Sequence, residues 1–549
     1  MKYKCLQTVS LLMVLCMITS LFGCGPEPSI VRYDISGEID SLDAQFADDE
    51  GEQLVIYNMM EGLTRQLPSG EVINGVIEKY EVSPDEKVYT FHLIPGMVWD
   101  DKEKTPVTAH DFVFAFQRIF NNIYPSPFAE MYSSIKNGSQ VLSGALPEEE
   151  LGVKALDDLT VEFTLDYADP SFLESLAHSS AMPCSQKLFE QASGKYGATI
   201  KETYSNGPFY LMRWENGNRI YLKHNDYYYG SQQVVSPGIY LYMDRDVQTE
   251  AQKSRGEEAA SKFELLMDGK SDGCLADYNQ YRQAKSQGMD CQTTDNIVWA
   301  LVFNQNHSAF QNQKVRQGFL RAIDRDALGS FLEENHQENL KTYNRLIPPA
   351  ISIFMESYTG QTQVSSINDY NTQSAYTVYR EGMDELEADT LRKIQLLVVD
   401  ESSIPEMCGM LQQAWQSTLA VSVNIQEVTQ NEMDSRLRSG DYQMALVPLK
   451  ASANTPADIL GRFTSDSYQN HTAYHSPDFE AVLNQAVSSH DKQTVLSQYA
   501  AAEKILMDDA AAYPLLVETS YFVMGQGVSG IEFYPYGGKI SFHNAIAPR

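Results

Sequence analysis

The sequence predicts an α/β protein of several domains, and three observations support this fold class. The chain has 549 residues, which is too many for one hydrophobic core, so roughly two to four domains are expected. Residues 390–449 show helix-like and strand-like segments in alternation. The first 300 residues are instead rich in short strand-like runs separated by turns, with a few clear helices.

The alternating region follows the order β-α-β-α-β. Its segments are 393–400, 407–419, 421–428, 433–440 and 442–449. This order builds a parallel sheet with crossover helices, and ligands of such sheets bind beyond the carboxyl ends of the strands. The last strand runs into a loop, within YQMALVPLKASANTPADIL (442–460), that carries one cation, Lys450, and no acid before Asp458. We therefore expect this loop to lie at a ligand site.

The strand-rich part contains segments with clear boundaries. Residues 88–99 alternate apolar and polar side chains and stop at Pro95-Gly96, as expected for a half-buried strand and a turn. A helix is predicted over 105–120, because Thr108 is suited to cap it and Asp111 lies in its first turn. Further strands are predicted over 159–167, 218–230 and 297–305, and one helix over 312–328.

Composition and charge exclude several classes of protein. The chain is 43% hydrophobic and has a net charge of −32. This hydrophobic content excludes a disordered chain. A strongly acidic chain lacks the basic surface that phosphate binding requires, so we expect no nucleic acid partner.

The N-terminus has the pattern of a bacterial lipoprotein signal. Two lysines precede an apolar run, 11–22, and Gly23 comes directly before Cys24. We predict a signal peptide over 1–23, lipidation of Cys24 and a tether over 24–33. The alternative is an ordinary secretory peptide with an incidental cysteine. No other run approaches the ~18 apolar residues of a transmembrane helix, so we expect an extracytoplasmic protein that is anchored to the cell membrane without spanning it.

Four cysteines remain after removal of the signal and lipidation. They are Cys184, Cys274, Cys291 and Cys408. They show no CxxC spacing, so no zinc site is expected. A disulfide between Cys274 and Cys291 is conceivable outside the cytoplasm, but free thiols are the favoured interpretation because connectivity cannot be read from a sequence.

No complete catalytic constellation is recognised in the sequence. It contains no GxxxxGK(S/T) or HExxH pattern, and DGKSDG (268–273) is interpreted as a turn, so we expect neither an enzyme nor a bound cofactor or metal. The loop 122–135 presents Phe128 and Tyr132 among Pro and Ser, and these aromatics are candidates for the wall of a site that binds an organic ligand. The alternative is that they cap a core.

Motifs spread along the whole chain resemble one protein family. They are GEIDSLDAQFADDEGEQLVIYNMMEGLTR (37–65), VSPDEKVYTFHLIPGMVWDDKEKTPVTAHDFVFAFQRI (82–119), LGVKALDDLTVEFTL (151–165), NGPFYLMRWENGNRIYLKHNDYYYG (206–230), LVFNQNHSAFQNQKVRQGFLRAID (301–324) and NHTAYHSPDFEAVLNQA (470–486). In this order they resemble the family-5 solute-binding proteins of ABC importers, which include oligopeptide- and dipeptide-binding proteins. The resemblance covers about residues 33–545.

The resemblance implies a two-lobed periplasmic-binding-protein-like fold, of type II and similar to cluster C, with an extra domain inserted in lobe I. Lobe I then comprises 34–72, 205–296 and 518–549, the extra domain 73–204, and lobe II 297–517. Solute is enclosed when the lobes close around it. The strand WALVFNQ (299–305) would lie at a crossing between the lobes, which makes Trp299 and Asn304 candidates for the hinge or the cleft wall.

The loop that contains Lys450 departs from the family pattern. In peptide-binding members it carries a Trp and then an Asp before a Pro, and the Asp pairs with the α-ammonium group of the peptide. With Pro456 on the family's Pro, the Trp position falls on Leu449 and the Asp position on Ser452. Asn454 lies in the same loop, and Lys450 favours a ligand with a carboxylate or another acceptor. The alternatives are that Lys450 points to solvent or that the register differs by a few residues.

The resemblance also implies a role in solute uptake. We expect a monomeric receptor that captures peptides in the cleft and delivers them to the permease and ATPase subunits of an ABC importer, while its lipid anchor holds it at the membrane. Two alternatives stay open. One is a binding protein for a non-peptide small solute, and the other is a lipoprotein that senses its ligand without transport.

Overall fold

The computed structural model describes residues 29–245 and 259–548, apart from 355, 367–369, 388–390, 392–393, 401–403, 490 and 538. The predicted signal peptide and the predicted lipidation site Cys24 lie outside these ranges. Within them, no helix has both the length and the hydrophobicity needed to span a bilayer.

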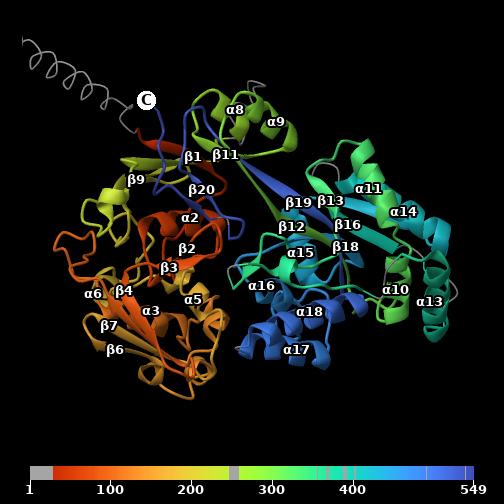
Figure 1. Ribbon diagram of the computed structural model, residues 1–549, viewed down its shortest axis with the longest axis horizontal. Helices are drawn as coiled ribbons and strands as arrows, with labels where there is room; N and C mark the ends of the chain where they lie inside the picture. The colour runs from red at the N-terminus through yellow and green to blue at the C-terminus, as the bar shows by residue number, and fades with distance from the viewer. Residues whose placement is uncertain are drawn as a thin grey trace, which may run out of the picture.

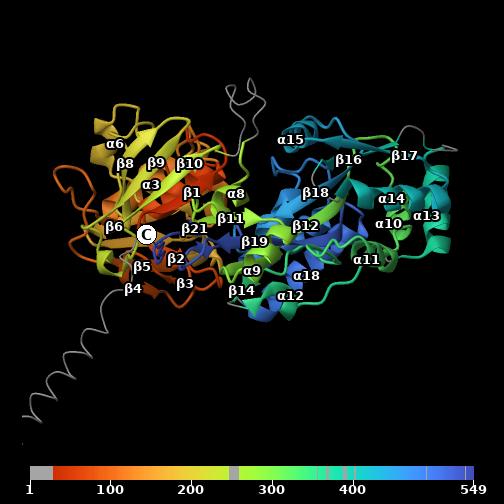
Figure 2. The ribbon, with the colours of Figure 1, turned by 90° about the horizontal axis from the view of Figure 1, so that it is seen from above.

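Two large hydrophobic cores organise the described chain into two bodies that lie side by side (Figure 1). A third, small cluster is formed by residues of 263–289 with Val523. The N-terminal body has a core built from residues 31–243 and 522–547. The C-terminal body has a core built from residues 298–517, joined by Tyr534 and Tyr536. A view from above shows β12 and β19 running between the bodies (Figure 2). The boundaries predicted for the lobes and the extra domain stay predictions.

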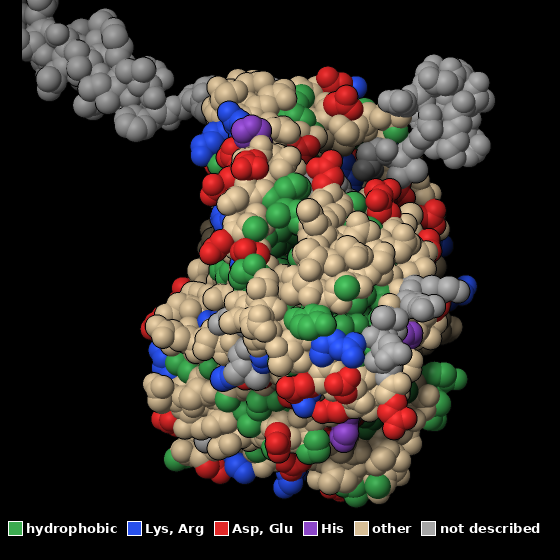
Figure 3. Space-filling view, turned by 90° about the vertical axis from the view of Figure 1, so that its right-hand side faces the viewer, with side chains coloured by type: hydrophobic (Ala, Val, Ile, Leu, Met, Phe, Trp, Pro, Cys, Tyr) green, Lys and Arg blue, Asp and Glu red, His purple; other side chains and the backbone are tan. Residues whose placement is uncertain are grey.

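Acidic and basic side chains are interspersed over the described surface of the C-terminal body that Figure 3 shows. The face carries charges of both signs close to one another. Such a mixture differs from the clustered Lys and Arg side chains of a nucleic-acid-binding surface.

The N-terminal body contains two four-stranded sheets, with strand orders β1-β10-β9-β8 and β4-β5-β7-β6. Its elements are β1 (Val31–Ile35), α2 (Glu50–Met59), β2 (Thr64–Gln66), β3 (Val72–Asn74), β4 (Ile77–Val82), β5 (Val88–Leu93), α3 (Ala109–Ile119), α4 (Gly138–Leu142), β6 (Val153–Asp157), β7 (Thr160–Thr164), α5 (Phe172–Ser175), α6 (Gln186–Gln191), β8 (Phe209–Glu215), β9 (Arg219–His224), β10 (Gly238–Met243), β20 (Glu532–Phe533) and β21 (Ile540–Ser541). The predicted helix over 105–120 is α3. Thr108 and Asp111 form its capping box, as the sequence pattern indicates.

The C-terminal body is built on a mixed sheet with strand order β11-β19-β12-β18-β16-β17. The predicted parallel arrangement is confirmed, because β16 pairs parallel with both β17 and β18. The elements from 262 onward are α8 (Lys262–Met267), β11 (Gly273–Ala276), α9 (Tyr278–Ser286), β12 (Cys291–Phe303), α10 (Gln313–Arg321), α11 (Arg325–Glu334), β13 (Leu340–Thr342), β14 (Ser352–Ile353), β15 (Glu356–Ser357), α12 (Tyr358–Gln361), α13 (Thr372–Glu385), β16 (Ile394–Val399), α14 (Ile404–Leu419), β17 (Val423–Val428), α15 (Gln430–Ser439), β18 (Met444–Lys450), α16 (Pro456–Leu460), α17 (Pro477–Ser488), α18 (Lys492–Asp508) and β19 (Ala512–Met524).

The prediction of one continuous helix over 312–328 is wrong, because the chain forms two helices there, α10 and α11. The side chain of Asp324 accepts hydrogen bonds from the backbone N–H groups of Asp326 and Ala327. An Asp in this position competes with helix continuation by capping a new helix. The apolar residues keep helical spacing across the break, so periodicity alone does not reveal it.

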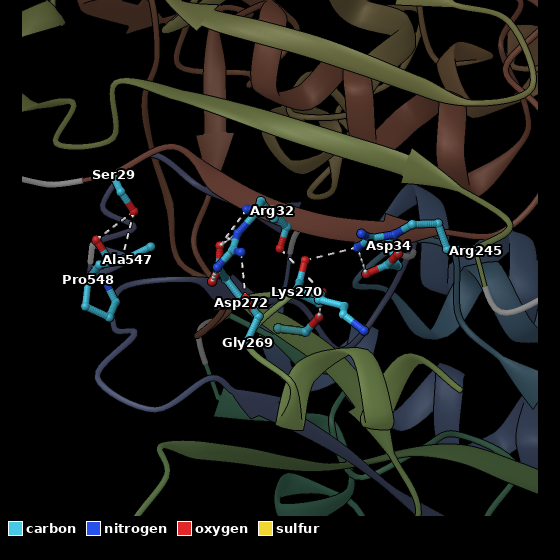
Figure 4. A network of polar contacts seen from close by, with 11 residues as sticks. Ser29, Arg32, Asp34, Arg245, Gly269, Lys270, Asp272, Ala547 and Pro548 are labelled. Carbon is cyan, nitrogen blue, oxygen red and sulfur yellow. Dashed lines mark hydrogen bonds and ion pairs between the residues drawn. The ribbon is translucent and has the colours of Figure 1, made fainter. Parts of the chain in front are cut away.

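The first described residues are tied to the N-terminal body by a network of polar contacts (Figure 4). The Arg32 guanidinium pairs with Asp272, with Nη2 2.7 Å from Oδ1, and Arg245 Nε lies 2.5 Å from Oδ1 of the buried Asp34. The Ser29 hydroxyl donates to the carbonyl oxygen of Ala547 at 3.1 Å. The start and the end of the described chain therefore lie together on one body.

The four described cysteines are free thiols. Cys274 on β11 and Cys291 on β12 both face Val523 of the intervening strand β19. Two strand spacings separate their Cα atoms by about 9.5 Å, whereas a disulfide requires less than about 7 Å. The conceivable Cys274–Cys291 bridge is therefore incompatible with this sheet.

We expect the protein purified without reductant to carry four alkylatable thiols when it is denatured. The strand register keeps Cys274 and Cys291 apart, and Cys184 and Cys408 are buried in different bodies. Intact mass after iodoacetamide treatment measures the number. A pair of thiols that reacts only after reduction would show that the register of β11 or β12 is wrong.

Candidate functional site

The two bodies touch where the loop after β18 meets the C-terminal segment 534–539. The Gly537 N–H donates to the Ala451 carbonyl at 3.2 Å. Gly537 has φ +62°, and a Cβ atom there would lie 2.9 Å from the Ser452 carbonyl oxygen, so a side chain would push the loop away. The predicted ligand loop therefore lies at the contact between the bodies.

Lys450 joins the two bodies through an ion pair. Its Nζ lies 2.7 Å from Oε1 of Glu50, the first residue of α2 in the N-terminal body. The side chains are 38% and 59% exposed, respectively, so water screens the pair. Because Glu50 already compensates the charge of Lys450, the structure does not favour the prediction that Lys450 holds a ligand carboxylate. The ion pair also differs from the alternative, in which the side chain of Lys450 points only to solvent.

Residue 452 is not acidic, but the carboxylate of Asp458 lies beside Ser452. The Asp458 carboxylate accepts hydrogen bonds from the backbone N–H of Ser452 at 3.0 Å and from its hydroxyl. Arg462, one turn further along the chain, places Nη2 2.8 Å from the same carboxylate. The i,i+4 spacing of Asp458 and Arg462 after Pro456 is a sequence signal for this pair, but its contact with Ser452 depends on the fold of the loop.

Three predicted site residues are packed inside the C-terminal body. Leu449 is buried in its core. Trp299 is also buried, and its Nε1 donates to Glu518 at 2.8 Å. The Asn304 side-chain amide donates to the carbonyls of Gly440 and Tyr442, both at 3.0 Å. Asn304 therefore holds a turn, and none of the three lines the cavity described below.

Asn454 lies at the contact between the bodies. It is buried, its Oδ1 accepts from the Ser352 N–H at 2.8 Å, and its Nδ2 has no hydrogen-bond partner among the residues that the structure describes. A Cβ atom built on Gly70 of the β2–β3 hairpin would lie 2.7 Å from this Nδ2. The loop after β18 and that hairpin therefore pack directly against each other.

The two predicted aromatic residues have different surroundings. Tyr132 is fully buried, packs against Phe116 and places its hydroxyl 2.7 Å from that of Ser180. It caps the core, so the prediction that it contacts a ligand is corrected. Phe128 is half-buried, and its ring lies 4.8 Å from the ring of the buried His178. Only Phe128 is placed where a ligand can reach part of its ring.

A small cavity lies in the N-terminal body, beside the C-terminal segment. Its lining residues include Tyr57, Glu61, Arg65, Tyr534, Lys539 and His543. It has about 30 Å³ of space for water-sized guests, which is enough for about two water molecules. The sequence patterns considered above did not indicate this site. Two local signals exist: the i,i+4 spacing of Glu61 and Arg65, and a single cation within the mostly apolar stretch FYPYGGKISF (533–542).

Lys539 is the most unusual group of this cavity. It is only 8% exposed, and its Nζ lies 4.3 Å and 4.6 Å from the ring centroids of Tyr57 and Tyr534. The aromatic faces attract its charge. Burial, together with the nearby charge of Arg65, lowers the pKa of the ammonium group to about 7.

Glu61 is the nearest buried acid of the cavity. Its carboxylate accepts hydrogen bonds from the hydroxyls of Tyr228 and, at 3.3 Å, Tyr229. Arg65 Nη1 lies 4.0 Å from its Oε1, and burial raises the pKa of Glu61. Burial also lowers the pKa of His543 to about 4, so its imidazole is neutral at pH 7. No group of three or more His, Cys, Asp or Glu side chains in the described ranges is arranged to hold a metal ion.

Comparison with known proteins identifies the family. The profile of the bacterial extracellular solute-binding proteins, family 5, matches residues 71–471, well over half of the chain. The chain belongs to this family. This family-5 protein is 26% identical over 554 residues to the oligopeptide-binding protein OppA of Bacillus subtilis, an alignment that covers 98% of both chains.

Solved structures show that the family-5 protein shares the fold of type II periplasmic binding proteins. Listeria monocytogenes OppA bound to peptide superposes with a TM-score of 0.74 at 23% identity, covering 96% of this chain and all of the other. The murein tripeptide-binding protein MppA in its unliganded open form gives a TM-score of 0.69 at 22% identity, covering 95% and 98%. The predicted two-lobed fold is thus confirmed.

We expect Lys450→Glu to favour separation of the two bodies. The substitution sets two carboxylates against each other at Glu50, which costs about 1 kcal/mol and changes the open-to-closed ratio roughly fivefold. Small-angle X-ray scattering measures the separation of the bodies as an increase in the radius of gyration. The double variant Glu50→Lys with Lys450→Glu restores opposite charges and should return the wild-type value. An unchanged radius in the single variant would contradict a role for this pair in closure.

We expect Lys539→Met to stabilise the protein below pH 7. The pKa of Lys539 is about 7 in the folded state, whereas an unperturbed lysine, as in the unfolded chain, has a pKa of 10.5. Between pH 7 and pH 10.5 the unfolded chain therefore binds more protons than the folded one, and the stability of the wild type rises with pH. The variant lacks this group. Its advantage in free energy of unfolding should be on the order of a few kcal/mol near pH 6 and should vanish as the pH approaches about 10.

Urea unfolding at both pH values measures this difference. Lys223→Met is the matched control, because Lys223 is an exposed lysine on β9 of the same body. Its effect should not depend on pH. A pH-independent difference between wild type and Lys539→Met would contradict a lowered pKa of Lys539.

Proposed function

We propose that this family-5 protein is the solute receptor of an ABC importer, that it captures peptides between its two bodies, and that it delivers them to the permease and ATPase subunits. The observation that carries the proposal is the family membership, combined with the position of the loop after β18 at the contact between the bodies. The relative from Bacillus subtilis is named for oligopeptide binding. Its family consists of binding proteins, which agrees with the expected absence of catalysis.

The receptor is anchored, in this proposal, through lipidated Cys24 on the extracytoplasmic side of the membrane. Lobe I comprises 34–72, 205–296 and 518–549, the extra domain 73–204, and lobe II 297–517. The two cores support the separation of lobe II from lobe I with its extra domain. The Lys450–Glu50 pair supports an arrangement in which the two bodies are in contact.

Asp458 takes the role of ammonium partner in this receptor. Its carboxylate lies at Ser452, at the family position of the acid that pairs with a peptide N-terminus. The side chain is 14% exposed and is already paired with Arg462, so a peptide ammonium would share the carboxylate with the guanidinium. Lys450, Ser452 and Asn454 belong to the neighbouring loop, and half-buried Phe128 is the candidate aromatic contact from the N-terminal body.

We expect random tri- to pentapeptides to raise the unfolding temperature of the protein. A ligand at a hundredfold excess over its Kd stabilises by about 2.7 kcal/mol. Asp458→Asn should weaken binding of peptides with a free N-terminus at least tenfold in calorimetric titration, because it removes the charged partner. N-acetylated peptides are the matched control and should bind wild type and variant alike.

The same titrations separate the alternatives. Stabilisation by metabolite pools without any stabilisation by peptides would replace peptide capture with a non-peptide solute. Peptide binding without uptake into cells that contain the neighbouring permease would indicate sensing instead of transport. Equal loss of both peptide classes in Asp458→Asn would remove the role proposed for this carboxylate.

A further inference from the structure

Two hydrogen-bond donors meet at the cavity without an acceptor. The Nζ of Lys539 has neither a hydrogen bond nor an ion pair with any residue that the structure describes, although the residue is only 8% exposed. The Nε of Arg65 is buried and also lacks a hydrogen-bond partner. Buried donors without partners are rare in folded proteins because their desolvation is not compensated.

The neighbouring acid does not compensate both cations. Glu61 accepts hydrogen bonds from the hydroxyls of Tyr228 and Tyr229, and it lies 4.0 Å from Nη1 of Arg65. His543 is neutral near pH 7, because its pKa is about 4. The cavity is thus lined by the Arg65 guanidinium, by Lys539 with a pKa of about 7, and by one carboxylate that is already hydrogen-bonded.

We propose that this cavity is an anion-binding subsite that accepts a carboxylate group between Lys539 and Arg65. A carboxylate supplies acceptor oxygens for both donors and a negative charge beside Lys539, which has no ion pair like the one between Arg65 and Glu61 among the described residues. The space of about 30 Å³ holds about two waters, so two carboxylate oxygens fit where a larger solute does not. The void excludes a whole peptide and selects a small anionic group.

The subsite lies close to the contact between the bodies. Tyr534, which lines the cavity, packs into the core of the C-terminal body. The electrostatic surroundings of His178 include both Lys539 and Asp458. The carboxylate can therefore come from a free small acid or from a peptide held in the cleft. Only the second source rests on the proposed function.

The experiment compares two classes of probe on the full mature protein at constant ionic strength. Sodium formate and sodium acetate probe the free anion, and peptides with a free or an amidated C-terminus probe the bound ligand. The variants are Lys539→Met and Arg65→Gln, and Lys223→Met is the matched control. Calorimetric titration gives affinity, and thermal unfolding verifies that each variant is folded.

We expect at least a tenfold loss of carboxylate affinity in Lys539→Met and in Arg65→Gln, with wild-type affinity in Lys223→Met. Loss with formate or acetate supports a site for free anions. Loss confined to peptides with a free carboxylate supports a subsite of the peptide cleft. If Lys539→Met does not fold, Arg65→Gln decides alone.

The proposal is overturned if neither class of probe binds, or if both variants bind every carboxylate as tightly as the control does. Failure of all peptides to bind removes the proposed function but not the subsite, because the formate and acetate titrations test the subsite separately. Equal affinity for free and amidated peptides, together with no binding of formate or acetate, overturns the subsite while peptide capture stands.

Discussion

The antiparallel pairing of β12 with β19 is the constraint on which the rest of the structure depends. Each strand is 13 residues long, and they pair from Cys291 with Val523 to Val302 with Ala512. One end of this ribbon enters the N-terminal core through Phe522 and Met524, and the other lies in the C-terminal core. Two register shifts interrupt the pairing, at Asp295/Ile297 and Trp299/Ala300. Irregularities of this kind bend strands, and here they lie along the ribbon that joins the bodies.

The ribbon also positions the loop after β18, which lies between the bodies. β18 pairs with β12 up to the contact of Lys450 with Ile297, so the chain leaves the sheet beside the register shift. The following loop meets the N-terminal body through Glu50, Gly70 and Gly537. Two ion pairs lie at this contact. Lys450 and Glu50 pair across it, whereas Asp458, beside Ser452, pairs with Arg462 of its own body.

The sequence predicted the features that depend on local pattern. The capping box of α3 and the parallel β16-β17 pairing follow from residues close together in the chain, and both are present. The position of the loop after β18 also follows, because the carboxyl ends of parallel strands are predictable from their order. The break at Asp324 was missed because apolar periodicity continues through it.

The roles of single side chains were much less predictable. Asn304 and Trp299 lie where the strand pattern placed them, but their polar atoms are used by Gly440, Tyr442 and Glu518, which are distant in sequence. The cavity brings Lys539 to Glu61 and Arg65, which lie more than 470 residues earlier in the chain. The i,i+4 spacing relates Glu61 to Arg65. The position of Lys539 beside them depends on tertiary packing, and no spacing rule predicts it.

The tie between Ser29 and Ala547 has a mechanical consequence. Both ends of the described chain belong to the same body, so a load applied at either end is carried by the N-terminal body. It passes to the C-terminal body through the β12–β19 ribbon and through the contacts of the loop after β18. A surface, a label or a fused domain attached at these ends therefore pulls on the N-terminal body and leaves the ends of the C-terminal body unloaded.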